Sequence, residues 1–313
     1  MRLRRPLLGP LAAVAALALA ACGSSESTRN APASTPAPGP TIVASTNVYG
    51  SIAEVVGGDI VKVESLVNDP AADPHSYEST PADAVKVAGA RIVVFNGAGY
   101  DDWMPQLVES AGGQRTVIDV AELSGLEPTT EPAEGAGEFN EHIWYSLPSV
   151  QTLATRLATE LGTADPANKA GYTANAERFN GEIDGLIQKA DAIGTAAPGT
   201  RVAVTEPVPG YLIDEAGLVN ATPDEFAEAI EEDTDPPAAV LQETLALFTG
   251  DPVRALILNA QTQTPTTDQV RQAAEAAGVP VIEVTETLPA GQTDYVTWMG
   301  TQIDALAGAV QRS

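Results

Sequence analysis

The chain contains only two histidines, and both lie in predicted loops. His75 follows an apolar, β-branched run at residues 61–67, and His142 follows a connection rich in glycine and glutamate. An imidazole can bind a metal ion, transfer a proton or form a purely structural hydrogen bond. Because a single histidine is most often a surface or hydrogen-bonded residue, these two alone do not define a site.

Two glutamates make the set more specific. Glu206 follows the predicted strand 201–205, and Glu286 follows the predicted strand 281–285. Ligands of open α/β sheets bind beyond the carboxyl ends of the strands, so both carboxylates are expected at the edge of a cleft. A strand-end glutamate is by itself more often solvated than functional. Together with the imidazoles, however, these groups are donors that suit a first-row divalent ion, and a metal-dependent hydrolase would use the same residue types.

Short β-branched runs that alternate with alanine-rich helical patterns must position these residues. Strands are predicted at 41–44, 61–67, 91–95, 116–120, 201–204, 255–258 and 279–284. Helices are predicted at 48–56, 80–88, 103–110, 222–231, 236–247, 268–277 and 295–310. This alternation predicts βαβ units with mostly parallel sheets. The pattern occurs twice, which indicates two α/β lobes at 41–164 and 198–313.

A different segment joins the two halves. Asp165 and Pro166 form a helix-start signal, an apolar period continues to about Ile193, and Pro198-Gly199 ends the pattern. At 1.5 Å per residue, a helix over 165–197 would be roughly 40 Å or more long. The sequence therefore predicts an α/β protein whose two lobes are joined by one long helix, with the ligand in the cleft between them.

The first 40 residues have the composition of a targeting segment and a tether. Arg2, Arg4 and Arg5 precede an apolar run at 7–20, and small residues lead to Cys22, the only cysteine of the chain. This arrangement is typical of an export signal and is similar to the bacterial lipobox, which implies that a lipid is attached to Cys22. Residues 1–22 are therefore interpreted as a lipoprotein signal peptide. Residues 23–40, rich in Ser, Thr, Pro, Ala and Gly, are interpreted as a flexible tether.

Charge and missing motifs exclude several function classes. The formal net charge is −26, which argues against nucleic acid as a partner. The run Asn96-Gly97-Ala98-Gly99 lacks the third glycine of a dinucleotide-binding loop and is interpreted as a turn. No phosphate-binding GxxxxGK[ST] motif and no G-x-S-x-G motif is present in the sequence.

Longer motifs around the four residues resemble a known family. They are Asp73-Pro74-His75-Ser76-Tyr77-Glu78 with Thr80-Pro81, Asn96-Gly97-Ala98-Gly99-Tyr100-Asp101-Asp102-Trp103-Met104, Glu141-His142-Ile143-Trp144, Thr205-Glu206-Pro207-Val208-Pro209-Gly210-Tyr211-Leu212 and Val284-Thr285-Glu286-Thr287-Leu288. In this order and spacing, over residues 41–310, the chain resembles the zinc- and manganese-binding lipoproteins of ABC importers.

The resemblance implies a fold, a site and a function. The fold is two pseudo-symmetric α/β lobes around a rigid linking helix, and the metal ligands are His75, His142, Glu206 and Glu286. The protein would be a monomeric binding protein, not an enzyme, anchored outside the cytoplasm by lipid on Cys22. It would carry one zinc or manganese ion to an ABC permease that works with a cytoplasmic ATPase. Asp73, Glu78 and Asn259 are candidates for orienting the ligands.

Some features depart from the family pattern or leave alternatives open. Residues 126–141 contain glutamates where some zinc-binding members have a histidine-rich loop, and Glu206 shifts the donors toward oxygen. The sequence therefore leaves the choice between manganese and zinc open. The alternatives are a metal-dependent hydrolase, a binding protein for a metal chelate, and a surface adhesion lipoprotein. An aromatic content of 5% gives little support to a wide chelate-binding cleft.

Overall fold

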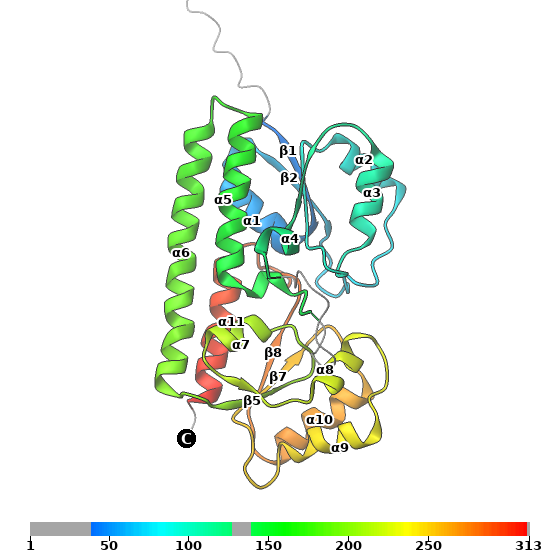
Figure 1. Ribbon diagram of the computed structural model, residues 1–313, viewed down its shortest axis with the longest axis vertical. Coiled ribbons are helices and arrows are strands. Elements are labelled where there is room, and N and C mark those ends of the chain that lie inside the picture. Colours follow the sequence, from blue (N-terminus) through cyan, green and yellow to red (C-terminus); the bar gives the residue numbers. More distant parts are fainter. Residues whose placement is uncertain (1–38, 127–138, 312–313) are drawn as a thin grey trace, which may run out of the picture. The chain divides into compact units, whose positions relative to one another are not determined.

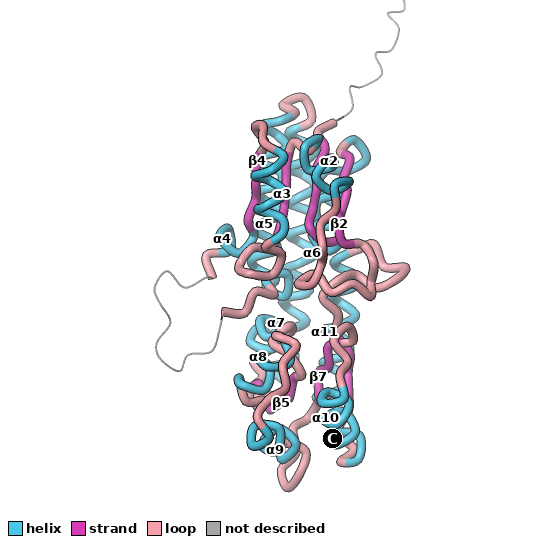
Figure 2. The backbone as a smooth tube through the Cα atoms, turned by 90° about the vertical axis from the view of Figure 1, so that its right-hand side faces the viewer, coloured by secondary structure: helices cyan, strands magenta, loops and turns pink. Residues whose placement is uncertain are grey.

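The computed structural model describes residues 39–126 and 139–311 (Figure 1). The predicted signal segment 1–22, with Cys22, and all but the last two residues of the predicted tether 23–40 lie outside the described residues. The same is true of most of the glutamate-containing stretch 126–141. Two separate groups of strands are visible in Figure 2, and each forms the centre of one α/β lobe.

The first lobe is built on a four-stranded parallel sheet with the strand order β2-β1-β3-β4. Every residue of the inner strand β3, Ile92–Phe95, is buried, as expected for a parallel sheet covered by helices on both faces. The strands of this lobe are β1 (Thr41–Thr46), β2 (Lys62–Val67), β3 and β4 (Thr116–Asp119). Its helices are α1 (Asn47–Gly57), α2 (Pro81–Gly89), α3 (Trp103–Ala111) and α4 (Val120–Ser124), with a short 3₁₀ turn at Gly58–Ile60.

The second lobe repeats this topology. Its four parallel strands have the order β6-β5-β7-β8, which is the same order relative to the chain as in the first lobe. The strands are β5 (Arg201–Val204), β6 (Val219–Asn220), β7 (Leu256–Asn259) and β8 (Val281–Val284). The helices are α7 (Gly210–Glu215), α8 (Asp224–Glu231), α9 (Ala238–Ala246), α10 (Pro265–Ala276) and α11 (Tyr295–Val310). The predicted fold class, two pseudo-symmetric lobes with parallel sheets, is confirmed.

Equivalent capping signals start one helix in each lobe. Thr80 before α2 and Thr264 before α10 each form a capping box with the third helical residue, and each is followed by proline. Such a box satisfies backbone N–H groups that the first helical turn leaves free. It makes α10 begin at Pro265, three residues before its predicted start. In the first lobe, the box at Thr80 fixes the end of the loop that carries His75.

The segment between the lobes is a hairpin of two helices, α5 (Leu147–Ala164) and α6 (Lys169–Ala196). The predicted helix start at Asp165 is wrong. Asp165 instead caps the carboxyl end of α5, and its carboxylate accepts hydrogen bonds from Asn168 Nδ2 (2.7 Å) and Tyr172 Oη (2.9 Å). An Asp-Pro pair therefore closes the turn between two helices here, and α5 is an element that the sequence analysis leaves unassigned.

The long helix α6 contacts both lobes. Its 28 residues span about 42 Å. Its buried side chains recur at helical spacing and form one stripe: Tyr172, Ala176, Phe179, Ile183, Leu186, Ala190 and Ile193. Near the first lobe α6 packs on α1 and α5, and near the second it packs on α7 and α11 (Figure 1). No helix within the described residues is both long and apolar enough to cross a bilayer.

Candidate metal centre

The four residues singled out from the sequence come from four loops. His75 lies in the loop between β2 and α2, and His142 directly precedes a 3₁₀ turn at Ile143–Tyr145. Glu206 and Glu286 each lie two residues beyond the end of a strand, β5 and β8 respectively. The expected position at the carboxyl ends of parallel strands is therefore found for both glutamates.

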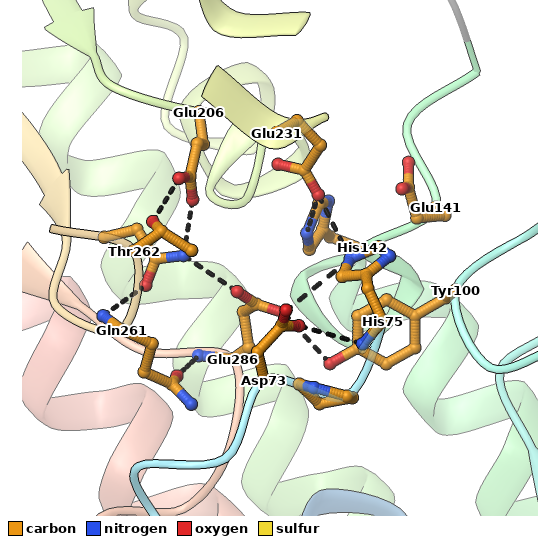
Figure 3. A network of polar contacts seen from close by, with 12 residues as sticks. Asp73, His75, Tyr100, Glu141, His142, Glu206, Glu231, Gln261, Thr262 and Glu286 are labelled. Atoms are coloured by element: carbon orange, nitrogen blue, oxygen red, sulfur yellow. Dashed lines mark hydrogen bonds and ion pairs between the residues drawn. The ribbon is translucent and has the colours of Figure 1, made fainter. Parts of the chain in front are cut away.

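Three of these side chains converge. One ligand atom from each of His75, His142 and Glu286 lies within 4.8 Å of the other two (Figure 3). His75 Nε2 is 3.9 Å from Glu286 Oε2. The side chains of His142 and Glu286 are 0% and 2% exposed, whereas that of His75 is 27% exposed. The group therefore joins a buried imidazole and a buried carboxylate to one imidazole that solvent can reach.

Glu206 lies beside this group and has other partners. Its Oε1 accepts a hydrogen bond from Thr262 Oγ1, and its Oε2 accepts one from Asn259 Nδ2. Asn259 Nδ2 also donates to Glu286 Oε1 over 2.8 Å. Of the residues expected to orient the ligands, Asn259 thus links the two predicted carboxylate ligands directly. Asp73 accepts a hydrogen bond from the backbone N–H of His75 (2.8 Å), and Glu78 is exposed.

A carboxylate that the sequence analysis missed contacts both histidines. Glu231, the last residue of α8, places its Oε1 3.1 Å from His75 Nε2 and 3.3 Å from His142 Nε2. Its side chain is 13% exposed. The rule that ligands bind beyond the carboxyl ends of strands does not apply to the end of a helix. In addition, the acidic sequence Glu231-Glu232-Asp233 has the composition of a solvated turn. Neither periodicity nor motif spacing contains a signal for this contact.

The ring of His142 is oriented by Asn140. His142 Nδ1 lies 2.8 Å from Asn140 Oδ1, while Asn140 Nδ2 donates to the carbonyl oxygen of Pro207 (2.9 Å). Because the amide oxygen can only accept, Nδ1 carries the proton and Nε2 is the nitrogen that faces the site. Nε2 is buried and has no hydrogen-bond partner among the described residues, so its contact with Glu231 is an ion pair without hydrogen-bond geometry.

Tyr100 of the first lobe contacts the carboxylate of Glu286 in the second lobe. Its hydroxyl donates to Glu286 Oε2 over 3.2 Å, and its ring meets that of His75 edge-on at 4.6 Å. The loop before it turns through Gly97 and Gly99, whose φ angles of 81° and 93° favour glycine. Asp101 fixes this loop, because its carboxylate accepts the backbone N–H groups of Asn96 and Gly97. The turn expected from the sequence is therefore present and aims Tyr100 at the site.

The contact between histidines and Glu231 dominates the electrostatics of the site. Burial lowers the pKa of His142, but its contact with Glu231 and the charges of Glu141 and Glu286 together outweigh this effect and raise the pKa to about 9. In His75, burial is likewise outweighed by Glu231 and Glu286, so the pKa is raised. Burial would raise the pKa of Glu231, yet the two imidazoles hold it well below its usual range. His142 is therefore cationic and Glu231 anionic at neutral pH, and His75 takes up a proton more readily than a free imidazole.

Burial has the opposite effect on the two predicted carboxylate ligands. It raises the pKa of Glu206 to about 8, and the negative charge of Glu231 adds to the rise. The pKa of Glu286 is also raised by burial, although His142 and His75 oppose the shift. Both groups therefore resist ionisation unless a positive charge is close, and a divalent cation would supply that charge.

Comparison with known proteins identifies the family. The family model for ZnuA, described as zinc-uptake complex component A, periplasmic, matches residues 42–309. The chain belongs to this family. It is 24% identical over 274 residues to the manganese-binding lipoprotein MntA of Bacillus subtilis strain 168, covering 86% of each chain. It is 25% identical over 208 residues to the iron ABC transporter substrate-binding lipoprotein MtsA of Streptococcus pyogenes serotype M1, covering 61% of this chain and 67% of the relative.

A crystal structure of ZnuA has the same fold. It matches 87% of this chain and the whole of the ZnuA chain, with a TM-score of 0.71 and 25% identity. The resemblance to zinc- and manganese-binding proteins of ABC importers is therefore confirmed. The proteins named here are binding proteins or transporter components by their names, and the hydrolase interpretation gains no support from them.

Proposed function

We propose that this ZnuA-family protein captures one divalent transition-metal ion, zinc or manganese, and delivers it to an ABC importer. The observation that carries the proposal is the convergence of His75 and His142 from one half of the chain with Glu286 from the other, within 4.8 Å. Two imidazoles and carboxylate oxygens suit such an ion, and carboxylates from the second lobe balance its charge. Binding one ion to both halves links the lobes.

Glu206 is the fourth proposed ligand, as the family resemblance implies. It is 1% exposed, and Asn259 joins its carboxylate to that of Glu286 through two hydrogen bonds. Each carboxylate oxygen has a second lone pair, so Glu206 can bind the ion while Asn259 keeps the two carboxylates together. This arrangement makes Asn259 the residue that positions both carboxylate ligands.

Calorimetric titration of the protein produced without residues 1–22 tests the proposal. We expect saturable binding of one zinc or manganese ion per chain near pH 7. Because the pKa of His142 is raised to about 9, the ion must displace a proton at neutral pH. The apparent association constant should therefore rise about tenfold per pH unit between pH 6 and pH 8 for each proton displaced. Below about pH 6 binding should weaken further, as carboxylates take up protons.

Repeating the titration in two buffers with different ionisation enthalpies counts the protons released. Saturable binding with at least one proton released at pH 7 is the expected result. If neither zinc nor manganese binds saturably near pH 7, the proposed function is wrong.

We further propose that a lipid on Cys22 holds the protein at the outer face of the cell membrane, beside its permease. The support is the lipobox-like sequence before Cys22 and the lipoprotein names of MntA and MtsA. Cys22→Ser should release the protein from the membrane fraction without changing its metal affinity, because the lipid is separated from the site by the tether. Cell fractionation measures the first effect and calorimetry the second. A Cys22→Ser protein that still partitions into the membrane through lipid would contradict this assignment.

A further inference from the structure

The separations around Glu231 are those expected between neighbouring ligands of one metal ion. A first-row divalent ion binds nitrogen and carboxylate oxygen at about 2.0–2.2 Å, so at angles of roughly 90–110° its ligand atoms lie about 3.0–3.4 Å apart. Glu231 Oε1 lies 3.1 Å from His75 Nε2 and 3.3 Å from His142 Nε2. Both separations are therefore already those of neighbouring ligand atoms on one metal ion.

We infer that Glu231 is itself a ligand of the transported ion and favours manganese over zinc. This inference rests on the proposed function and adds to it a donor from the carboxyl end of α8, which the family resemblance does not include. Together with Glu206 and Glu286 it gives two nitrogen and three carboxylate donors. An oxygen-rich set of more than four donors suits manganese, whereas a zinc site normally closes at four.

Two atoms at this contact can bind an ion once His142 has released its Nε2 proton. His142 Nε2 and Glu231 Oε2 are both buried, and neither has a hydrogen-bond partner among the described residues. Both carboxylate oxygens of Glu206, in contrast, already accept hydrogen bonds. Buried polar atoms are normally satisfied, so two unpartnered atoms on residues that are in contact point to a ligand at this place.

Glu231, which contacts both histidines, also lines a cavity of about 370 Å³. The wall of this cavity carries further carboxylates: Glu141, Asp214, Asp224, Glu228 and Glu232. Glu141 shares a second group with His75 and Glu231, in which one ligand atom of each lies within 4.8 Å of the others. An ion that approaches through this cavity meets a negative surface, and Glu231 is the part of it that reaches both imidazoles.

The acidic cavity calls for controls that separate ligation from general electrostatic attraction. Glu231→Gln removes the charge but keeps the size of the side chain. Glu232→Gln removes the same charge from the adjacent residue on the cavity wall, and Glu225→Gln removes it from an exposed position on α8. All three variants lower the negative charge of one short segment by one unit, but only one of them changes a group in contact with the histidines.

The experiment measures the dissociation constants of manganese and zinc for the full-length chain and the three variants, and the visible spectrum of each with cobalt(II). Even residues that only orient ligands typically change affinity by about 10- to 100-fold. Glu231→Gln should therefore weaken manganese binding at least about tenfold and zinc binding less. Its cobalt spectrum should become more intense, because the d–d bands strengthen as the coordination number falls. The other two variants should stay within about threefold of wild type, with unchanged spectra.

The results separate this inference from the proposed function. If the unaltered protein binds neither metal, the proposed function fails. If it binds metal, but Glu231→Gln retains wild-type affinities and the wild-type cobalt spectrum, then Glu231 is not a ligand and the proposed function stands. An equal loss of affinity in Glu231→Gln and Glu232→Gln, with unchanged spectra, would assign the effect to charge alone and would also overturn the inference.

Discussion

His142→Ala should weaken metal binding by at least about a hundredfold and abolish the stabilisation that metal provides. A ligand orienter is typically worth about 10- to 100-fold in affinity, and a ligand should be worth more. His142 is 0% exposed and is already oriented by Asn140, so water cannot readily replace the imidazole with the same geometry. Its loss would also leave Glu231 and Glu286 without a buried cationic partner. Calorimetry and thermal melting with and without metal measure the two effects.

A matched core variant separates lost binding from lost stability. Leu306 is buried on α11 and makes none of the contacts of the site, and Leu306→Ala should lower the melting temperature by creating a cavity. It should nevertheless keep the full rise on adding metal. A His142→Ala protein with wild-type metal affinity would remove His142 from the site.

The same variant should alter how the stability of the metal-free protein depends on pH. The folded-state pKa of His142 is raised to about 9 from 6.5, so its contribution is fully present below about pH 6.5 and is lost as the pH rises through about 9. The pKa of Glu231 is lowered, so the same ion pair loses its effect as the pH falls below the normal range of a carboxyl group. Wild-type stability should therefore decline between pH 6.5 and 9, and His142→Ala should make that decline smaller; the raised pKa values of His75, Glu206 and Glu286 account for the part that remains.

The sequence predicts the two-lobe fold well because most strands of the two parallel sheets are short, largely apolar and β-branched runs. Such runs identify seven of the eight strands in the described residues. The exception is β6, Val219–Asn220, which has only two residues, both exposed at the edge of the sheet. So short a strand exists because it pairs with β5, and no local pattern predicts it.

The connection between the lobes shows why a correct local signal can still give the wrong boundary. Asp165-Pro166 is a genuine end-of-helix signal, but the same residues can precede a helix or close the one before it. Helix α5 does have buried residues at helical spacing, namely Leu147, Val150, Leu153, Ala154 and Leu157. This spacing is itself a signal that predicts a helix. The side-chain bond from Tyr172 to Asp165, which decides the turn, depends on α5 and α6 packing together.

The sequence predicts which residue types lie near the site, but it does not predict which side chains contact one another. His75 and Glu286 follow strands β2 and β8 of two different sheets, and the structure brings both side chains together with His142. The partners of Glu206 come from β7 and the loop after it, Asn259 and Thr262, which have no sequence relation to β5. Glu231 reaches the histidines only because α8 ends there. Side-chain partners that depend on tertiary packing leave no periodic trace in the sequence.

The second large effect is expected at the buried carboxylates of the second lobe. A ligand that binds only the folded protein stabilises it by about 2.7 kcal/mol at a hundredfold excess over Kd. For a protein of this size that corresponds to a rise in melting temperature of about 5 °C. Glu206→Ala and Glu286→Ala should each lose most of this rise, because removing either group leaves the +2 charge of the ion under-neutralised.

The melting temperature of the metal-free protein should respond much less to these changes. Burial raises the pKa of both Glu206 and Glu286, so ionising them costs stability in the folded protein once the pH exceeds the unfolded-state pKa. Glu286→Gln is the matched variant, because it keeps one acceptor oxygen for Asn259, its amide N–H can donate to the hydroxyl of Tyr100, and it cannot carry charge. At pH 8 it should melt at or above the wild-type temperature without metal and still lose most of the metal-induced rise. A rise that persists undiminished in both alanine variants would mean that the ion is bound without these two carboxylates, and the proposed link between the lobes would then be wrong.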